Sequence, residues 1–186
     1  MFKTPEVSET ELIRKCKESN LKNQEKLYKH FYGYAMGIGL RYLSNREDVL
    51  EVVNDAFIKV FISIKNFDEE QPFKPWFRKI LVNTAIDRRR KDLKYLEQVD
   101  IEKADDVLQS SAAIETLTVK DILLLLNRLP EMQRIVFNLY EIDGYSHDEI
   151  GQTLNITASS SRVYLSRAKE KLKKTWTEQE NYERIS

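Results

Sequence analysis

Helix-breaking residues are scarce along this chain, and their scarcity restricts its fold more than any other feature of the sequence. Its 186 residues include five glycines and four prolines. Between these residues, apolar side chains recur at steps of three and four, which is the spacing of a helix with one buried face. No stretch alternates apolar and polar residues as a half-buried strand would. The sequence therefore predicts an all-α fold.

Local signals mark where several of the helices begin. Pro75 suits the first position of a helix expected from Trp76 to about Asp92, because the proline ring lacks the N–H that goes unpaired there. Elsewhere, a serine followed three residues later by a glutamate matches a capping box. This pattern predicts three further helix starts, at Ser8 with Glu11, Ser44 with Glu47 and Ser146 with Glu149.

Three glycines lie inside the second predicted helix, at positions 33, 37 and 39. Each costs about 1 kcal/mol relative to alanine in a helix interior. We expect close packing against a neighbouring helix to compensate for this cost.

Charge divides the chain although the total is balanced. Residues 1–97 hold 19 basic and 15 acidic side chains, whereas residues 98–121 hold 2 basic and 6 acidic. Residues 122–174 are again basic, with 8 against 6. Such asymmetry favours separate basic lobes over one uniformly charged surface. We predict two helical lobes, residues 8–97 and 119–175, joined by an acidic linker at 98–118.

Several functional classes find no support in the sequence. Cys16 is the single cysteine, and His30 and His147 have no ligand-like spacing, so neither a disulfide nor a metal site is expected. No nucleophile–base pair or phosphate loop indicates an enzyme or a cofactor. The longest apolar run, 122–126, is too short to cross a membrane. With no apolar leader, a soluble, cytoplasmic protein without membrane insertion is expected.

Residues 146–174 have the pattern of a helix-turn-helix. Asn155 can adopt a left-handed conformation in the turn, and Thr157 is a good N-cap for the next helix. Serines and an arginine at the start of that helix suit approach to a major groove, and the lysines near its end suit phosphates. An ordinary serine- and lysine-rich surface helix remains the alternative. The inner face is predicted to hold Ala158, Ser161, Leu165, Ala168 and Leu172.

The stretch 72–92 is both aromatic and basic. Lys79, Asn83 and Arg90 share one helical face, which Trp76 flanks towards the core. Aromatic and basic side chains together suit single-stranded nucleic acid, since bases stack on rings and phosphates pair with cations. Alternatively, Trp76 is plain core and the arginine run 88–90 is a solvated helix end.

The helix before it has an apolar stripe from Val49 to Ile64 with two isoleucines off that stripe. Ile58 and Ile62 fall on a face with Glu51 and Asp55. Apolar residues rimmed by acids can mark a surface that binds a partner. Single exposed isoleucines are also common on proteins without any such role.

Three segments taken in order resemble one family. DVLEVVNDAFIKVF (48–61), PFKPWFRKILVNTAIDRRRK (72–91) and the stretch 129–174 are similar to extracytoplasmic-function (ECF) RNA polymerase sigma factors. The resemblance covers roughly residues 8–175. It implies a factor that binds core polymerase and directs promoter-specific initiation, with residues 8–97 as sigma region 2 and 119–175 as sigma region 4.

The resemblance also implies roles for individual residues. The polymerase partners would be the clamp helices of the largest subunit and the flap, and the loop 66–74 would capture an unstacked base. Residues implied to contact polymerase are Asp48, Glu51, Asn54, Asp55 and Ile58. Residues implied near minus-ten DNA are Trp76, Lys79, Asn83 and Arg90. Residues implied to face the minus-thirty-five duplex are Ser159, Ser160, Arg162, Val163, Ser166 and Arg167.

The sequence departs from the family pattern at several positions, and Ser161 on the inner face is expected to weaken the packing of its helix slightly. Pro75 replaces a usual threonine, Asn155 and Ser159 stand where glycine is commoner, and Ser161 stands where an apolar residue is commoner. A stand-alone helix-turn-helix regulator is the alternative function, and a purely protein-binding helical adaptor is a third. No further domain is expected after residue 174. Signal input is therefore expected from expression level or from another protein, which leaves room for an anti-sigma factor.

Overall fold

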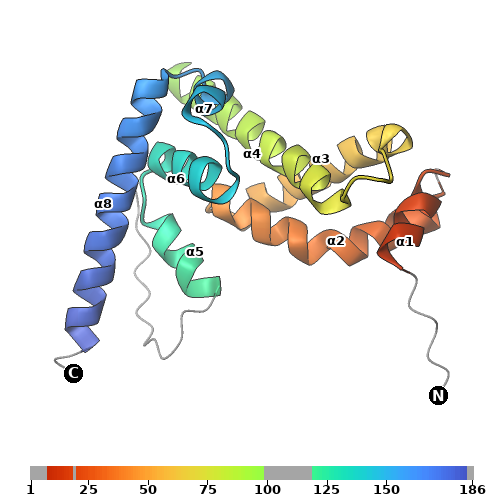
Figure 1. Cartoon of the computed structure of the whole chain (residues 1–186), viewed down its shortest axis with the longest axis horizontal. Helices are drawn as coiled ribbons and strands as arrows, with labels where there is room; N and C mark the ends of the chain where they lie inside the picture. Colours follow the sequence, from red (N-terminus) through yellow and green to blue (C-terminus); the bar gives the residue numbers. More distant parts are fainter. Residues whose placement is uncertain (1–7, 19, 99–118, 184–186) are drawn as a thin grey trace. The chain divides into compact units, whose positions relative to one another are not determined.

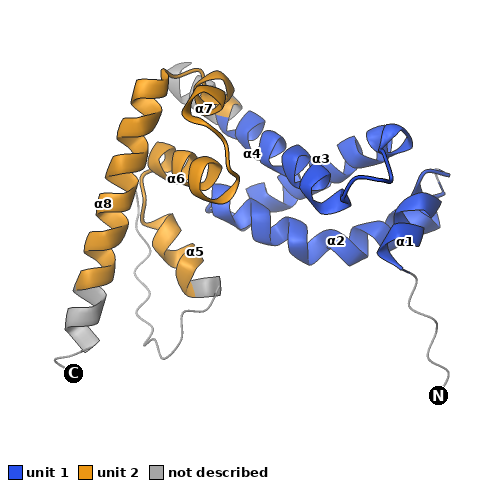
Figure 2. Ribbon diagram, in the orientation of Figure 1, with its two compact units in different colours: residues 1–89 blue, residues 90–186 orange. Residues whose placement is uncertain are grey.

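The computed structural model describes residues 8–18, 20–98 and 119–183, with side chains described for 8–18, 20–90 and 121–177. Helices and short connections make up these ranges, and no strand occurs in them, so the predicted all-α fold is confirmed (Figure 1). The chain divides into two compact units, residues 1–89 and 90–186 (Figure 2). The predicted acidic linker lies almost wholly outside the described residues.

Unit 1 is a small bundle built around aromatic side chains. Phe31, Phe57 and Phe77 are buried, and the Phe77 ring centroid lies 6.0 Å from that of Phe31 and 4.9 Å from that of Phe57. Phe73 joins them, 4.8 Å from the Phe31 ring. These four rings come from three helices, α2, α3 and α4, so their burial holds the helices together. The elements are α1 (Glu9–Cys16), α2 (Leu21–Tyr42), α3 (Arg46–Ser63), the short η1 (Ile64–Asn66) and α4 (Phe73–Gln98).

Two of the expected helix starts in unit 1 are shifted. The N-cap of α3 is Asn45, whose side chain accepts from the Glu47 N–H at 2.8 Å, and not Ser44. Asparagine is as good an N-cap as serine and stands one residue nearer the helix. Helix α4 begins at Phe73, two residues before Pro75. Pro75 is tolerated there because the first four N–H groups of a helix have no intrahelical acceptor.

The predicted close packing of the three glycines in α2 is right at one position and wrong at two. A Cβ at Gly39 would lie 2.7 Å from Val49 Cγ1, so α3 approaches α2 closely there. At Gly33 and Gly37 a Cβ would meet nothing within 4 Å. Both positions face solvent, where the cost of glycine is uncompensated by packing.

This difference predicts opposite stability effects for one and the same substitution. Gly37→Ala should stabilise unit 1 by about 1 kcal/mol, because alanine is the better helix former. Gly39→Ala should destabilise it by about 1 kcal/mol, because overpacking a full core costs roughly 1–3 kcal/mol and outweighs the helix gain. Urea unfolding followed by Trp76 fluorescence in a Trp176→Phe background measures both. Shifts of the same sign would contradict the packing inferred at Gly39.

Unit 2 packs its helices around Leu126, Ile135, Leu139, Ile150 and Ala168, all buried. Helix α8 contacts each of the other α-helices of this unit. Helix α5 ends at Asn127, and α6 begins directly after Pro130. The elements are α5 (Val119–Asn127), α6 (Glu131–Phe137), the π-helical η2 (Asn138–Ile142), α7 (His147–Leu154) and α8 (Ala158–Glu183).

The helix-turn-helix prediction for α7 and α8 is confirmed. Ser146 and Glu149 form the reciprocal capping box expected at the start of α7. Asn155 ends α7 in the left-handed region, with φ of 56°. Thr157 Oγ1 accepts from the Ser160 N–H at 3.0 Å and so caps α8. The turn is tight, since a Cβ on Gly151 would lie 2.8 Å from the Ile156 carbonyl oxygen.

Two further details of unit 1 concern single residues. Cys16 is fully buried, and burial raises the pKa of its thiol to about 11. Ser8 caps α1 by accepting from the Glu11 N–H at 3.2 Å. No helix within the described ranges is both long and apolar enough to cross a membrane.

Candidate functional site

The outward face of α3 carries the five residues implied to bind polymerase. Ile58 is 55% exposed and Ile62, one turn further, is 75% exposed, as expected for residues off the core stripe. Glu51, Asn54 and Asp55 are exposed on the same helix, whereas Asp48 is half-buried. The sequence therefore predicted the exposure of this face correctly, and its partner stays a prediction.

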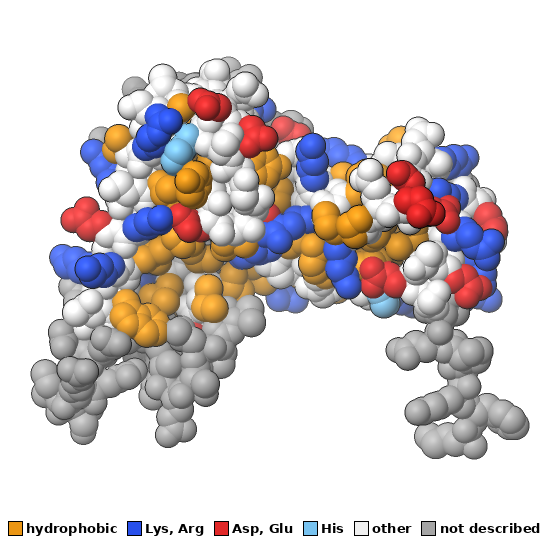
Figure 3. Space-filling model, in the orientation of Figure 1, with side chains coloured by type: hydrophobic (Ala, Val, Ile, Leu, Met, Phe, Trp, Pro, Cys, Tyr) orange, Lys and Arg blue, Asp and Glu red, His pale blue; other side chains and the backbone are white. Residues whose placement is uncertain are grey.

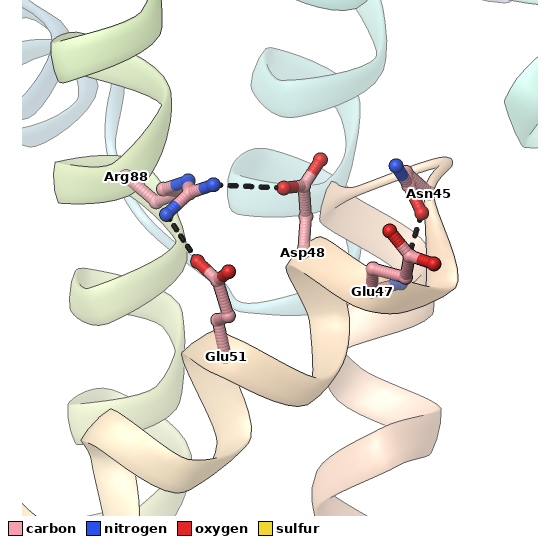
Figure 4. A network of polar contacts seen from close by, with 5 residues as sticks. All are labelled: Asn45, Glu47, Asp48, Glu51 and Arg88. Atoms are coloured by element: carbon pink, nitrogen blue, oxygen red, sulfur yellow. Dashed lines mark hydrogen bonds and ion pairs between the residues drawn. The ribbon is translucent and has the colours of Figure 1, made fainter.

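Two carboxylates of this face are already bound within the chain. Arg88 on α4 donates through Nη2 to Asp48 Oδ1 at 2.9 Å and through Nη1 to Glu51 Oε2 (Figure 4). A single guanidinium thus joins two carboxylates one turn apart on α3. Asp48 and Glu51 therefore tie α3 to α4, a role that the sequence reasoning missed. Arg88, the first residue of the arginine run 88–90, is therefore a contact between helices of unit 1.

Asn54 also has a partner within unit 1. Its Oδ1 accepts from the Tyr28 hydroxyl at 3.0 Å, which joins α3 to α2. The Tyr28 ring lies 4.6 Å from the Phe57 ring, and burial raises the pKa of its hydroxyl. Asp48, Glu51 and Asn54 therefore each bond to a neighbouring helix. Among the described contacts, the exposed side chains of Asp55 and Ile58 make no such bond.

The face of α4 predicted to meet minus-ten DNA is partly core. Lys79, Asn83 and Arg90 are exposed, in agreement with their shared helical spacing. Trp76 is half-buried, with its ring 4.8 Å from Phe67 and 5.5 Å from Phe73. One side of this indole belongs to the aromatic core, so Trp76 is partly a core residue, as the alternative interpretation predicted. Its remaining exposed edge continues the line of Asn83 and Lys79.

The connection before α4 borders a cavity of about 400 Å³. The connection is anchored to α1, because Lys17 Nζ donates to the Phe67 carbonyl oxygen at 2.8 Å and pairs with Glu69 at 2.7 Å. Acidic and basic side chains are interspersed at this end of unit 1 (Figure 3). The lining residues are Glu9, Thr10, Ile13, Phe67, Glu69, Glu70, Gln71, Pro72, Phe73 and Lys74.

The N-terminal half of α8 turns polar side chains outward, as the spacing predicted. Ser160 is the exception among them, since it is half-buried and its hydroxyl lies 2.9 Å from that of Thr157. Ser161, Leu165 and Ala168 are buried against the rest of unit 2. Of the six residues implied to face the minus-thirty-five duplex, the other five are exposed: Ser159, Arg162, Val163, Ser166 and Arg167.

Two further contacts refine this surface. Lys169 pairs with Glu141 at 2.6 Å, so its ammonium is engaged within unit 2 and is a poorer candidate for a phosphate than Lys171 or Lys173. Ser161, expected on the inner face as a packing defect, instead shares a hydrogen bond with His147 Nδ1 at 2.9 Å. Periodicity placed Ser161 correctly but carried no signal for its partner 14 residues away.

Comparisons with known proteins agree with this geometry. The model of sigma-70 region 2 matches residues 27–94, and that of sigma-70 region 4 matches residues 120–172. The ECF RNA polymerase sigma factor SigW of Bacillus subtilis is 30% identical over 146 residues, which cover 72% of this chain and 78% of SigW. The chain belongs to the ECF sigma factor family. An ECF sigma factor binds RNA polymerase core and directs initiation at specific promoters, so this chain is a regulator of transcription.

Other relatives match a larger share of this chain. The RNA polymerase sigma factor YlaC of Bacillus subtilis is 26% identical over 171 residues, covering 87% of this chain and 96% of YlaC. The sigma factor RpoE of Bartonella quintana, solved with the anti-sigma factor NepR, has a TM-score of 0.55 at 19% identity. That likeness covers 84% of this chain and 98% of RpoE, and shows the fold alone. A stand-alone helix-turn-helix regulator would leave the region 2 match unexplained.

Proposed function

We propose that the sigma factor divides its work among three surfaces. Residues 8–97 form region 2, whose α3 face around Asp55 and Ile58 docks on the clamp helices of polymerase and whose α4 opens the minus-ten element. Residues 119–175 form region 4, whose α8 reads the minus-thirty-five element and which contacts the flap. Residues 98–118 link the two.

The exposed N-terminal half of α8 is the observation that best supports this proposal. Its five outward residues include two arginines and two serines, all short or flexible enough for a base edge or a phosphate. The helix follows a turn in which Asn155 is left-handed, and its outward residues begin with Ser159 in its first turn. The second helix of a helix-turn-helix with exposed polar residues near its N-terminal end suits the role of a recognition helix.

On the α3 surface, Asp48, Glu51 and Asn54 are bonded within the chain, so we do not place them at the centre of the polymerase contact. Ile58 has an exposed apolar side chain. Covering it with a partner surface would release more free energy than contacting a carboxylate that is already bound to Arg88. We therefore propose Ile58 as the centre of the docking surface, with Ile62 beside it. Asp48 and Glu51 support the surface by holding α3 against α4.

Transcription with purified components tests the whole proposal. Core polymerase is supplied with a promoter library, with and without the chain, and transcripts are sequenced. We expect the chain to confer initiation at one promoter class, and the chain without core to show no comparable preference for that DNA. Sequence-selective binding by the chain alone would instead favour the stand-alone regulator. In this proposal the chain acts in the cytoplasm without a catalytic role, and an anti-sigma factor is a further partner.

Asn83→Ala and Arg90→Ala are expected to impair promoter opening more than association with core. Both side chains are exposed on α4, where polar and basic groups can contact unstacked bases and phosphates. Permanganate footprinting of the transcription bubble measures opening, and a pull-down measures core association. Lys29→Ala, which removes an exposed lysine from α2, is the control. Normal melting in both variants would contradict the assignment of this face.

A further inference from the structure

A partly buried polar contact joins the two helices of the helix-turn-helix. Ser161, the fourth residue of α8, is fully buried, and its hydroxyl oxygen lies 2.9 Å from Nδ1 of His147, the first residue of α7. The other side of the imidazole is covered by the Tyr140 ring, which stacks on it at 4.4 Å with 22° between the planes. Three elements, η2, α7 and α8, therefore meet at His147.

The opposite end of α7 is already fixed against the turn. The Ile156 N–H donates to the Gly151 carbonyl oxygen at 3.0 Å, and no space remains for a side chain on Gly151. The α7–α8 pair thus has a tight contact at Gly151 and a hydrogen bond near the start of α7. These two points together constrain the angle between the helices.

We propose that His147 is a positioning residue for the recognition helix, acting through Ser161. It fixes how far the N-terminal end of α8 projects from unit 2, and so which bases Ser159, Arg162 and Val163 can reach. The proposal rests on the minus-thirty-five role proposed for α8. It adds a determinant of specificity on α7 that contacts α8 through Ser161, on the buried side of that helix.

Helical geometry explains why this contact controls the reading face. Residues advance about 100° each around a helix, so Ser159 and Val163, two positions from Ser161, lie nearly opposite it. A hydrogen bond holds heavy atoms about 2.9 Å apart, whereas two carbon atoms in contact sit about 3.5–4.0 Å apart. Replacing the bond by an apolar contact therefore moves the start of α8 by roughly 0.5–1 Å. Hydrogen bonds to base edges do not survive displacements of that size unchanged.

Two kinds of variant separate positioning from stability. Ser161→Ala removes the hydroxyl and leaves His147 without this partner. The double variant His147→Leu with Ser161→Val replaces the polar pair by an apolar one of similar shape, which can be nearly neutral for stability. Ser161→Thr keeps the hydroxyl and serves as the conservative rescue. Thr175→Ala is the matched control, since its hydroxyl bonds to the Lys171 carbonyl of its own helix.

The experiment measures transcription by each full-length variant with core polymerase on a library of minus-thirty-five sequences, together with core binding and thermal unfolding. We expect Ser161→Ala and the double variant to lose roughly tenfold in discrimination at one or more positions. Core binding should stay unchanged. The double variant should recover the melting temperature that Ser161→Ala loses but not the wild-type preference, whereas Ser161→Thr and Thr175→Ala should keep that preference.

A double variant with the wild-type preference profile would overturn the proposal and show that the pair serves stability alone. That result differs from failure of the proposed function. If the wild-type chain itself shows no minus-thirty-five preference, the reading role of α8 is wrong, and the positioning role is rejected with it.

Discussion

Ile58→Asp is expected to abolish binding of the chain to core RNA polymerase while leaving unit 1 folded. The side chain is 55% exposed in the free chain, so a carboxylate there stays hydrated and costs the fold little. In the docked state the same position would be covered by apolar partner surface. An unpaired buried charge costs about 3–5 kcal/mol, and each 1.4 kcal/mol is about tenfold in Kd. Binding should therefore weaken by at least about two orders of magnitude.

A matched control makes this prediction specific. Leu21 is also apolar and is 81% exposed, at the first position of α2, where an aspartate suits the helix N-terminus. Leu21→Asp should bind core as the wild-type chain does. A pull-down with purified core, supported by circular dichroism of both variants, measures the difference. If Ile58→Asp binds as well as Leu21→Asp, the docking surface lies elsewhere.

Ile58 is a sharper probe of docking than the acidic residues beside it. Replacing Asp48 or Glu51 would remove a partner of Arg88 as well as any contact with polymerase. A loss of core binding in those variants would therefore mix a loosened α3–α4 contact with a lost interface. The exposed isoleucine has no such second function among the described contacts.

Helix identity and helix faces could be predicted from this sequence because both depend on local spacing. The outward positions of Ile58, Asn83 and Arg162 follow from a period of 3.6 residues, and the structure agrees. Helix ends were less predictable. Asn45 displaced Ser44 as a cap because adjacent residues competed for the same bond, and spacing alone cannot rank them.

Contacts between residues that are distant in sequence could not be predicted from periodicity. Arg88 meets Asp48 and Glu51 across 37–40 residues, and nothing local distinguishes Arg88 from the two arginines that follow it. The His147–Ser161 bond likewise depends on the angle at which α7 and α8 pack. Such contacts require the tertiary fold, so the sequence indicated which faces are exposed but not which of their side chains are already engaged.

Arg162→Ala and Lys173→Ala should affect promoter recognition in different ways. Arg162 is exposed near the start of α8, within reach of a base edge if the helix enters the major groove. An arginine bound to a base contributes roughly 1–3 kcal/mol of discrimination. We expect Arg162→Ala to flatten preference at one or two positions of the minus-thirty-five element. Lys173, eleven residues further along, should contact only phosphate.

Lys173→Ala should therefore weaken all promoter variants about equally and reduce the salt slope of binding by about one. The two variants are matched, since each removes one exposed cation from the same helix. Transcription from the library of minus-thirty-five sequences at two salt concentrations separates the two effects. If Arg162→Ala keeps the wild-type preference profile, Arg162 is a phosphate contact, and base reading must fall to the serines and Val163 on the same face. If Lys173→Ala changes preference instead, the C-terminal part of α8 lies closer to the bases than a recognition helix entering by its N-terminal end would allow.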